Sequence, residues 1–297
     1  MVGCGDEVGV INLGGVMEEK YTKASLQIIN DIFYVKGLSI RGRITLIRQY
    51  TEILCRILLE EKGHLRLANF EKKLNMVLPN AHFKDELFQH VKNITNLGNS
   101  ATHLEVDLAE VDEQDQKSAI NSLNFIISYL FINYFSKYRF GINEHSMSIF
   151  SLLPPFIRVN VLTHLYEKDK ENVAIMYKLP LAILKSEGMT MAIKWIEDNK
   201  ELLSKTPWGP YNMYEFNLNK IQYLNESQPN GFTPLYSSFE EALGYYNSKI
   251  ERYRDDDKQD IRELIKLTDF IYVGRMPEKY DLSRLDDYLL HRFTILP

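Results

Sequence analysis

The stretch that decides the fold is residues 40–61, IRGRITLIRQYTEILCRILLEE. Its apolar side chains recur every three or four residues, with Thr51 in the one gap, and this is the period of one face of an α-helix. They are Ile40, Ile44, Ile47, Leu54 and Leu58. Ser39 stands directly before them, where its hydroxyl can accept a hydrogen bond from a free backbone N–H. We therefore predict a long amphipathic helix that begins after Ser39.

A second side of the same helix carries what we call the arginine stripe, which consists of Arg41, Arg48, Glu52 and Arg56. Arg48 and Glu52 are four residues apart, so their opposite charges are neighbours on a helix surface. We expect these two side chains to pair.

Working outward, the same periodicity predicts helices over most of the chain. The expected ranges are 18–34, 69–78, 83–97, 114–136, 155–168, 172–187, 190–204, 237–254, 256–270 and 281–292. Residues 137–153 are predicted to be a break between helices. Residues 206–236 are predicted to be an irregular, packed connection that has room for a short helix or strand. No segment shows sustained alternation with period two, so the sequence predicts an all-α fold without an extensive sheet.

A chain of 297 residues favours two domains. Residues 1–16 are predicted to be a flexible leader, which leaves open whether Met1 or Met17 is the natural start. The break over 137–153 ends at Pro154-Pro155 and predicts a boundary. We expect one helical domain over 17–140 and a second over 150–297.

Composition excludes several classes of function. The net charge is −5 with no long basic run, so a broad nucleic-acid surface is not expected, although a local patch is allowed. The apolar stretch Leu123–Phe135 falls short of the roughly 20 residues that cross a membrane, so no membrane partner is expected. Cys4 and Cys55 form no metal-ligand pair, and a buried thiol at Cys55 fits a cytoplasmic protein. No phosphate-binding loop or zinc spacing occurs, so no cofactor or metal is predicted.

One local motif has chemical content: Gly98-Asn99-Ser-Ala-Thr-His103, which directly precedes an acidic loop and the most apolar helix. We expect Gly98 to end the preceding helix and Asn99 to cap the next turn. His103 would then reach inward to the arginine stripe. The predicted polar cluster is Arg48, Glu52, Asn99 and His103.

This order of parts resembles the HEPN-like domains of uncharacterised function that occur alone or attached to the R subunits of type I restriction enzymes. The resemblance covers residues 20–137 and rests on Arg-x-x-x-Glu in a long helix, followed by Gly-Asn-x-Ala-x-His. It implies an antiparallel helical bundle that is often dimeric. The class includes RNases, toxins, nucleotide-binding modules and scaffolds.

The nucleolytic members of that class use Arg-x(4–6)-His without a metal. The histidine acts as general acid or base, and the arginine stabilises the charge of the phosphorane. In this sequence the arginine would fall at Asn96, Leu97 or Gly98, none of which is basic, and Lys92 is the nearest cation. The resemblance therefore favours a member without nuclease activity.

Three hypotheses follow. The first is a non-catalytic HEPN-like module of a prokaryotic anti-phage defence or restriction system, acting as a homodimer or by docking to a catalytic partner. The second is a metal-independent RNase or toxin that uses His103. The third is a helical protein-binding module centred on residues 155–204. The four residues of the polar cluster could equally form a buried network that only fixes the bundle.

Overall fold

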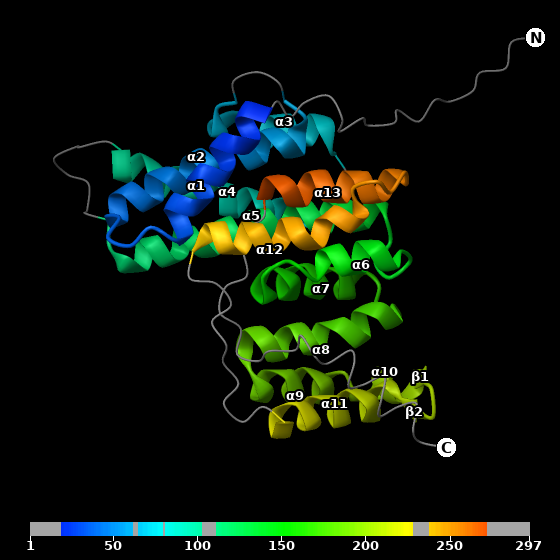
Figure 1. The fold of residues 1–297 in the computed structure, drawn as a ribbon. Helices are drawn as coiled ribbons and strands as arrows, with labels where there is room; N and C mark the ends of the chain where they lie inside the picture. Colours follow the sequence, from blue (N-terminus) through cyan, green and yellow to red (C-terminus); the bar gives the residue numbers. More distant parts are fainter. Residues whose placement is uncertain (1–18, 62–64, 80, 103–110, 228–237, 272–297) are drawn as a thin grey trace, which may run out of the picture. The chain divides into compact units, whose positions relative to one another are not determined.

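A computed structural model describes residues 19–61, 65–79, 81–102, 111–227 and 238–271 (Figure 1). Within these residues the chain forms thirteen α-helices, and its strands are limited to one two-stranded hairpin. The predicted all-α fold is therefore confirmed. Among the same residues, no helix combines the length and the apolar character that crossing a bilayer requires.

The described residues form two compact units, and the division falls inside α5. The first unit contains the residues up to Ile120 together with Asp269–Ile271, and the second contains Asn121 to Thr268. These units are groups of residues in mutual contact, whereas the expected domains 17–140 and 150–297 are regions predicted to fold independently. The domain bounds therefore stay a prediction.

The first unit is built around the helix predicted from residues 40–61. Its elements are α1 (Glu19–Phe33), α2 (Ile40–Leu59), the 3-10 turn η2 (Leu67–Asn69), α3 (Phe70–Val77), α4 (Lys84–Thr102) and the first turns of α5 (Glu113–Lys137). Helix α2 contacts α1, α3 and α4. Ser39 caps it, accepting a hydrogen bond from the Gly42 amide at 3.1 Å. The apolar stripe is buried as expected at Ile44, Ile47, Leu54 and Leu58, and so are Tyr50 and Cys55.

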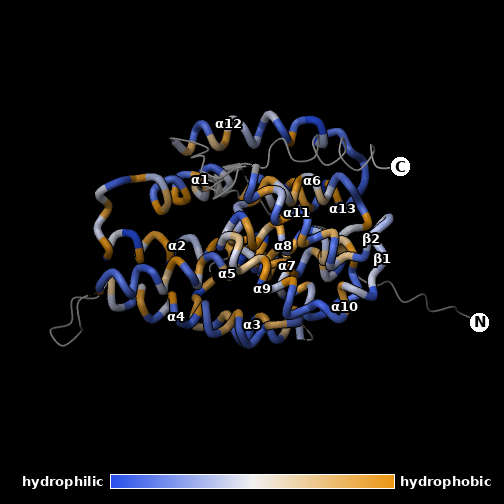
Figure 2. Tube along the Cα trace, turned by 90° about the horizontal axis from the view of Figure 1, so that it is seen from below, coloured by the Kyte–Doolittle hydropathy of each residue, from blue (hydrophilic) through white to orange (hydrophobic). Residues whose placement is uncertain are grey.

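The second unit holds the remaining elements. They are the rest of α5, α6 (Glu144–Phe150), α7 (Pro155–Lys168), α8 (Val173–Glu187), α9 (Met189–Asp198), α10 (Lys200–Lys205), β1 (Pro207–Trp208), β2 (Tyr211–Asn212), α11 (Met213–Ser227), α12 (Phe239–Ile250), the 3-10 turn η3 (Glu251–Tyr253) and α13 (Gln259–Ile271) up to Thr268. Helix α8 lies between α7 and α9 and also contacts α11 (Figure 1). In Figure 2 orange segments gather where α7, α8 and α9 overlap in the view, as expected for helices that bury apolar faces.

Helix α8 contains Pro180, which is buried. Proline has no N–H, so the carbonyl of Met176, four residues earlier, loses its helical donor. The side-chain amide of Asn217 on α11 donates to that carbonyl at 3.1 Å, and Lys220 Nζ donates to the next one, of Tyr177, at 3.2 Å. Helix α11 therefore supplies the bond that the proline removes from α8, together with a further bond to the next carbonyl.

Aromatic rings fill the part of the second unit where α5 meets α6. The Phe150 ring is T-shaped against Phe135 and Phe140, with both centroids at 5.3 Å, and against Phe131 at 6.4 Å. Edge-to-face pairs of this kind add to the free energy gained by burying the rings. The apolar stretch of α5 is a core helix, as the sequence predicted.

Three predicted boundaries were wrong. Helix α4 does not end at 97 but continues through Gly98 and Asn99 to Thr102, so Asn99 caps no new turn. Residues 137–153 contain α6, whose seven residues are too few to show a helical period. Residues 206–236 contain α11, which begins where Asn212 Oδ1 accepts a hydrogen bond from the Glu215 amide. The expected leader 1–16 and helix 281–292 lie outside the described residues.

Candidate functional site

The arginine stripe meets α4 at Gly98. A methyl group added to Gly98 would lie 2.3 Å from Cδ of Arg48 and 3.0 Å from its Cβ and Cγ. The side-chain stem of Arg48 thus fills the space that any residue other than glycine would need at position 98. Glycine is placed here for close approach of two helices, not for a turn.

The charges of the stripe pair differently from the prediction. Glu52 Oε1 accepts a hydrogen bond from Arg56 Nη2 at 2.6 Å, so the carboxylate is bonded to the arginine that follows it. Arg48 does not bond to Glu52, and its guanidinium makes no hydrogen bond or ion pair with any residue that the structure describes. The expected Arg48–Glu52 pair was wrong.

Of the predicted polar cluster, Arg48 lies against Gly98 at the contact between α2 and α4, and Asn99, the next residue of α4, is exposed. His103 follows the last residue of α4 and lies outside the described residues. Whether the cluster is complete, and whether it is structural or functional, stays a prediction.

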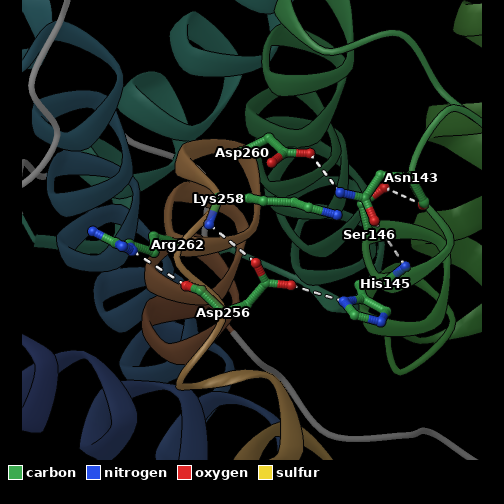
Figure 3. Close-up of polar contacts among 7 residues, drawn as sticks. All are labelled: Asn143, His145, Ser146, Asp256, Lys258, Asp260 and Arg262. Atoms are coloured by element: carbon green, nitrogen blue, oxygen red, sulfur yellow. Dashed lines mark hydrogen bonds and ion pairs between the residues drawn. The ribbon is translucent and has the colours of Figure 1, made fainter.

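A second polar constellation, which we call the His145 junction, lies in the second unit (Figure 3). It consists of Asn143, His145, Ser146, Asp256, Lys258, Asp260 and Arg262, which come from the start of α6, the connection before α13 and the first turn of α13. His145 Nδ1 lies 2.8 Å from Asp256 Oδ2, and Asn143 Nδ2 donates to Asp260 Oδ2 at 2.8 Å. Two side-chain bonds thus join α6 to the segment that leads into α13.

Hydrogen bonds between side chains and the backbone hold the same residues in place. Asn143 Oδ1 accepts from the His145 amide at 3.0 Å, and the Ser146 hydroxyl donates to the Asn143 carbonyl at 2.7 Å. Asp256 Oδ1 accepts from the Lys258 amide at 3.0 Å, while Arg262 Nε donates to the Asp256 carbonyl at 3.2 Å. Asn143, His145 and Asp256 are therefore each held by a second, local bond.

The electrostatics of the junction centre on Asp256. Its side chain is 11% exposed, whereas that of His145 is 51% exposed. The hydrogen bond from His145, followed by that from the Lys258 amide, lowers the pKa of the Asp256 carboxyl below its ordinary value. A carboxylate on Nδ1 fixes the orientation of an imidazole and leaves Nε2 for another partner. With Nδ1–H donated to the carboxylate, the lone pair of Nε2 can accept a hydrogen bond from another partner.

Sequence reasoning missed the junction. In the sequence, the run Asp255-Asp256-Asp257 is typical of solvated residues before a helix, and Asp255 and Asp257 are indeed exposed. Asp256 instead points at His145, more than a hundred residues away in sequence. The available signal was an asparagine two residues before a histidine, which is typical of a capped helix start, but nothing local identifies the distant carboxylate.

The region 155–204 was the third candidate. The predicted pairing of KLPLAILKSEG with MTMAIKWIEDNK is observed as the adjacent helices α8 and α9, which turn at Gly188 with φ +97°. Most apolar side chains of α8 are buried. Met191 on α9 is the one large apolar side chain of 155–204 that is exposed, at 42%.

Neither of the sites can be assigned through a relative. Comparison with models of protein families, with curated proteins and with solved structures finds no match to this chain.

Proposed function

We propose that the chain is a non-catalytic helical module of HEPN-like type that works in a prokaryotic defence or restriction system, by dimerising or by docking to a catalytic partner in the cytoplasm. The observation that carries this proposal is the contact between Gly98 and Arg48. In the nucleolytic pattern, position 98 is one of the places for the arginine, and here the space for a side chain at 98 is filled by α2.

The order of the parts supports the same proposal. The long arginine-bearing helix α2 packs on α4, which carries the Gly-Asn-x-Ala-x-His element up to Thr102. The chain after α4 then enters α5, whose apolar residues from Leu123 to Phe135 are mostly buried. This is the succession of helices that the resemblance implies for residues 20–137.

The experiment is an affinity purification of the full chain from its native host, followed by identification of co-purified proteins. A co-purified nuclease, helicase or ATPase that is absent from an untagged control supports docking. Size-exclusion chromatography with light scattering on the purified chain tests dimerisation. A monomer that recovers no such partner contradicts the proposal.

A second candidate is a metal-independent RNase that uses His103, and one observation favours it. The stem of Arg48 runs through the place of a side chain at position 98, five residues before His103, so a guanidinium from α2 takes the place of the missing one on α4. The histidine would remove the proton of a 2′-hydroxyl, and the arginine would stabilise the charge on phosphorus.

The two candidates differ in their effect on cells. The RNase predicts growth arrest and fragmented RNA on strong expression, both abolished by His103→Ala and by Arg48→Ala. Glu226→Ala, at an exposed position in the second unit, is a matched control that should retain the arrest. Normal growth with intact RNA on expression of the wild-type chain excludes the RNase and leaves the non-catalytic module.

A further inference from the structure

The first half of α2 and the turn before it form a locally basic segment in an acidic chain. Between Asp31 and Glu52 the sequence contains Lys36, Arg41, Arg43 and Arg48 and no carboxylate. The net charge of the whole chain is −5, so these cations are concentrated rather than scattered.

The four arginines of α2 differ in whether their guanidiniums are bonded. Arg43 Nη2 donates to the Val35 carbonyl at 3.1 Å and holds the turn between α1 and α2. Arg56 is bonded to Glu52. By contrast, neither the Arg41 nor the Arg48 guanidinium forms a hydrogen bond or ion pair within the described part of the chain. Two cations on one helix are therefore left for an external anion.

The spacing of these two cations is fixed by the helix. Arg41 and Arg48 are seven residues apart, so they lie on the same side of α2, about 10.5 Å apart along its axis at 1.5 Å per residue. Gly98 holds the stem of Arg48, which lowers the entropy lost when its guanidinium binds a ligand. Asn99, the residue after Gly98, is exposed on α4 and can donate from its amide.

We propose that Arg41 and Arg48 form the docking face for an acidic protein segment that presents two carboxylates about two helical turns apart. The proposal rests on the docking function proposed above and names the face that performs it. A guanidinium binds a carboxylate through two parallel N–H···O bonds, which gives such a face geometric selectivity as well as attraction.

Charge distribution favours an acidic protein segment over a nucleic acid. Binding of nucleic acid through its backbone depends on neutralising several phosphates. This face offers two guanidiniums that are unbonded within the described residues. A nucleic-acid strand would also extend its charge beyond the basic segment, where the chain has an excess of acidic residues. A short acidic segment that ends within the face avoids this repulsion.

The test uses the full chain and a synthetic helical peptide of alanine and glutamine with two glutamates seven residues apart. Binding is followed at low salt through the arginine Nε–H signals in NMR spectra. We expect the signals of Arg41 and Arg48 to shift and those of Arg43 and Arg56 to stay. A peptide with glutamine in place of both glutamates should cause no shift.

Variants distinguish binding at the docking face from a general effect of removing positive charge. Arg41→Gln and Arg48→Gln should each weaken peptide binding about two- to fivefold, the range of a single exposed ion pair. Arg48→Lys keeps the charge but loses the paired bonds, and it should lie between Arg48→Gln and the wild type. Lys194→Gln, at an exposed position on α9, removes the same charge elsewhere and should leave binding unchanged.

Unchanged arginine signals, equal weakening by Lys194→Gln, or tighter arginine-dependent binding of a fifteen-nucleotide thymidine strand would each overturn the proposal. If circular dichroism shows that Arg48→Gln does not fold, Arg41→Gln decides, because Arg41 is not seated on Gly98. A native partner whose recovery is insensitive to both variants removes this face but leaves the docking function. Recovery of no partner removes the docking function instead.

Discussion

The contact between α2 and α4 and the His145 junction join helices by opposite means. At α2 and α4 a glycine allows close approach, and the Arg48 stem fills the space while its guanidinium pairs with no residue that the structure describes. At the junction, side chains cross between segments, and His145 and Asp256 are bonded to each other. The difference teaches that burying a stem and pairing a charge are separate problems. Where the stem is buried and the charge is not paired within the described residues, the charge can bind another molecule.

The largest change is expected in the aromatic core beside the junction. Phe150→Ala removes a ring that contacts three other phenylalanines, and such truncations cost about 3–5 kcal/mol in the free energy of unfolding. Urea unfolding followed by circular dichroism measures this. A loss below about 1 kcal/mol would mean that hydrogen bonds, not aromatic packing, hold α5 to α6.

Gly141→Ala tests how rigidly the turn into α6 is held. Gly141 has φ +92°, and an added methyl group would lie 2.4 Å from Cβ of Ala174. A left-handed conformation costs a non-glycine residue about 1–2 kcal/mol, and overpacking adds about 1–3 kcal/mol. We expect a loss of at least about 2 kcal/mol in the same urea experiment. A neutral substitution would show that the turn can move.

Gly98→Ala is the corresponding test in the first unit. The clash is with a flexible stem rather than a fixed methyl group, and alanine gains about 1 kcal/mol of helix propensity over glycine. We expect a net loss of about 1–2 kcal/mol, smaller than at Gly141. The double variant Gly98→Ala with Arg48→Ala should recover most of the loss, because the methyl group then occupies the freed space. Additive losses would contradict the close approach.

The smallest effect concerns the pH dependence of the junction. The pKa of Asp256 is lower in the folded chain than its ordinary value of 3.8, so folding favours the ionised carboxylate. Its contribution to stability is present above pH 3.8 and is lost as the pH falls through the lower folded pKa. The difference in stability between wild type and Asp256→Asn should therefore disappear in acid.

The control is Asp257→Asn, because Asp257 is the exposed neighbour and its side chain bonds to no described residue. Its stability should follow the wild type across the same pH range. A difference for Asp256→Asn that persists below the lowered pKa of Asp256 in the folded chain would show that the substitution acts through packing and not through charge.

The fold was predictable where helices are long and one face is apolar. Helix α2 was found through its stripe and Ser39, and the ends of α7 and α8 were predicted within a residue. The C-terminal end of α4 and the existence of α6 were not predicted. In α4, a glycine is compatible both with the end of a helix and with a close contact to a neighbouring helix. Tertiary contacts decide whether such a glycine ends the helix or allows a close contact.

The candidate sites show the same limit. The partner of Glu52 could not be chosen from the sequence, since Arg48 and Arg56 are equally spaced on either side of it. The close contact of Arg48 with Gly98 was not predicted. The His145 junction was missed because its halves are far apart in sequence. Pairing across such distances leaves no periodic signal.

The hydrogen bond between Asn217 and the Met176 carbonyl makes the residues at positions 180 and 217 depend on each other. The carbonyl is available only because residue 180 is a proline, and a buried amide at 217 is useful only while that carbonyl is available. Each substitution alone leaves a buried polar group without its partner. Descendants of this chain should therefore exchange Pro180 and Asn217 jointly, and the pair should be visible as a correlated substitution wherever related sequences are aligned.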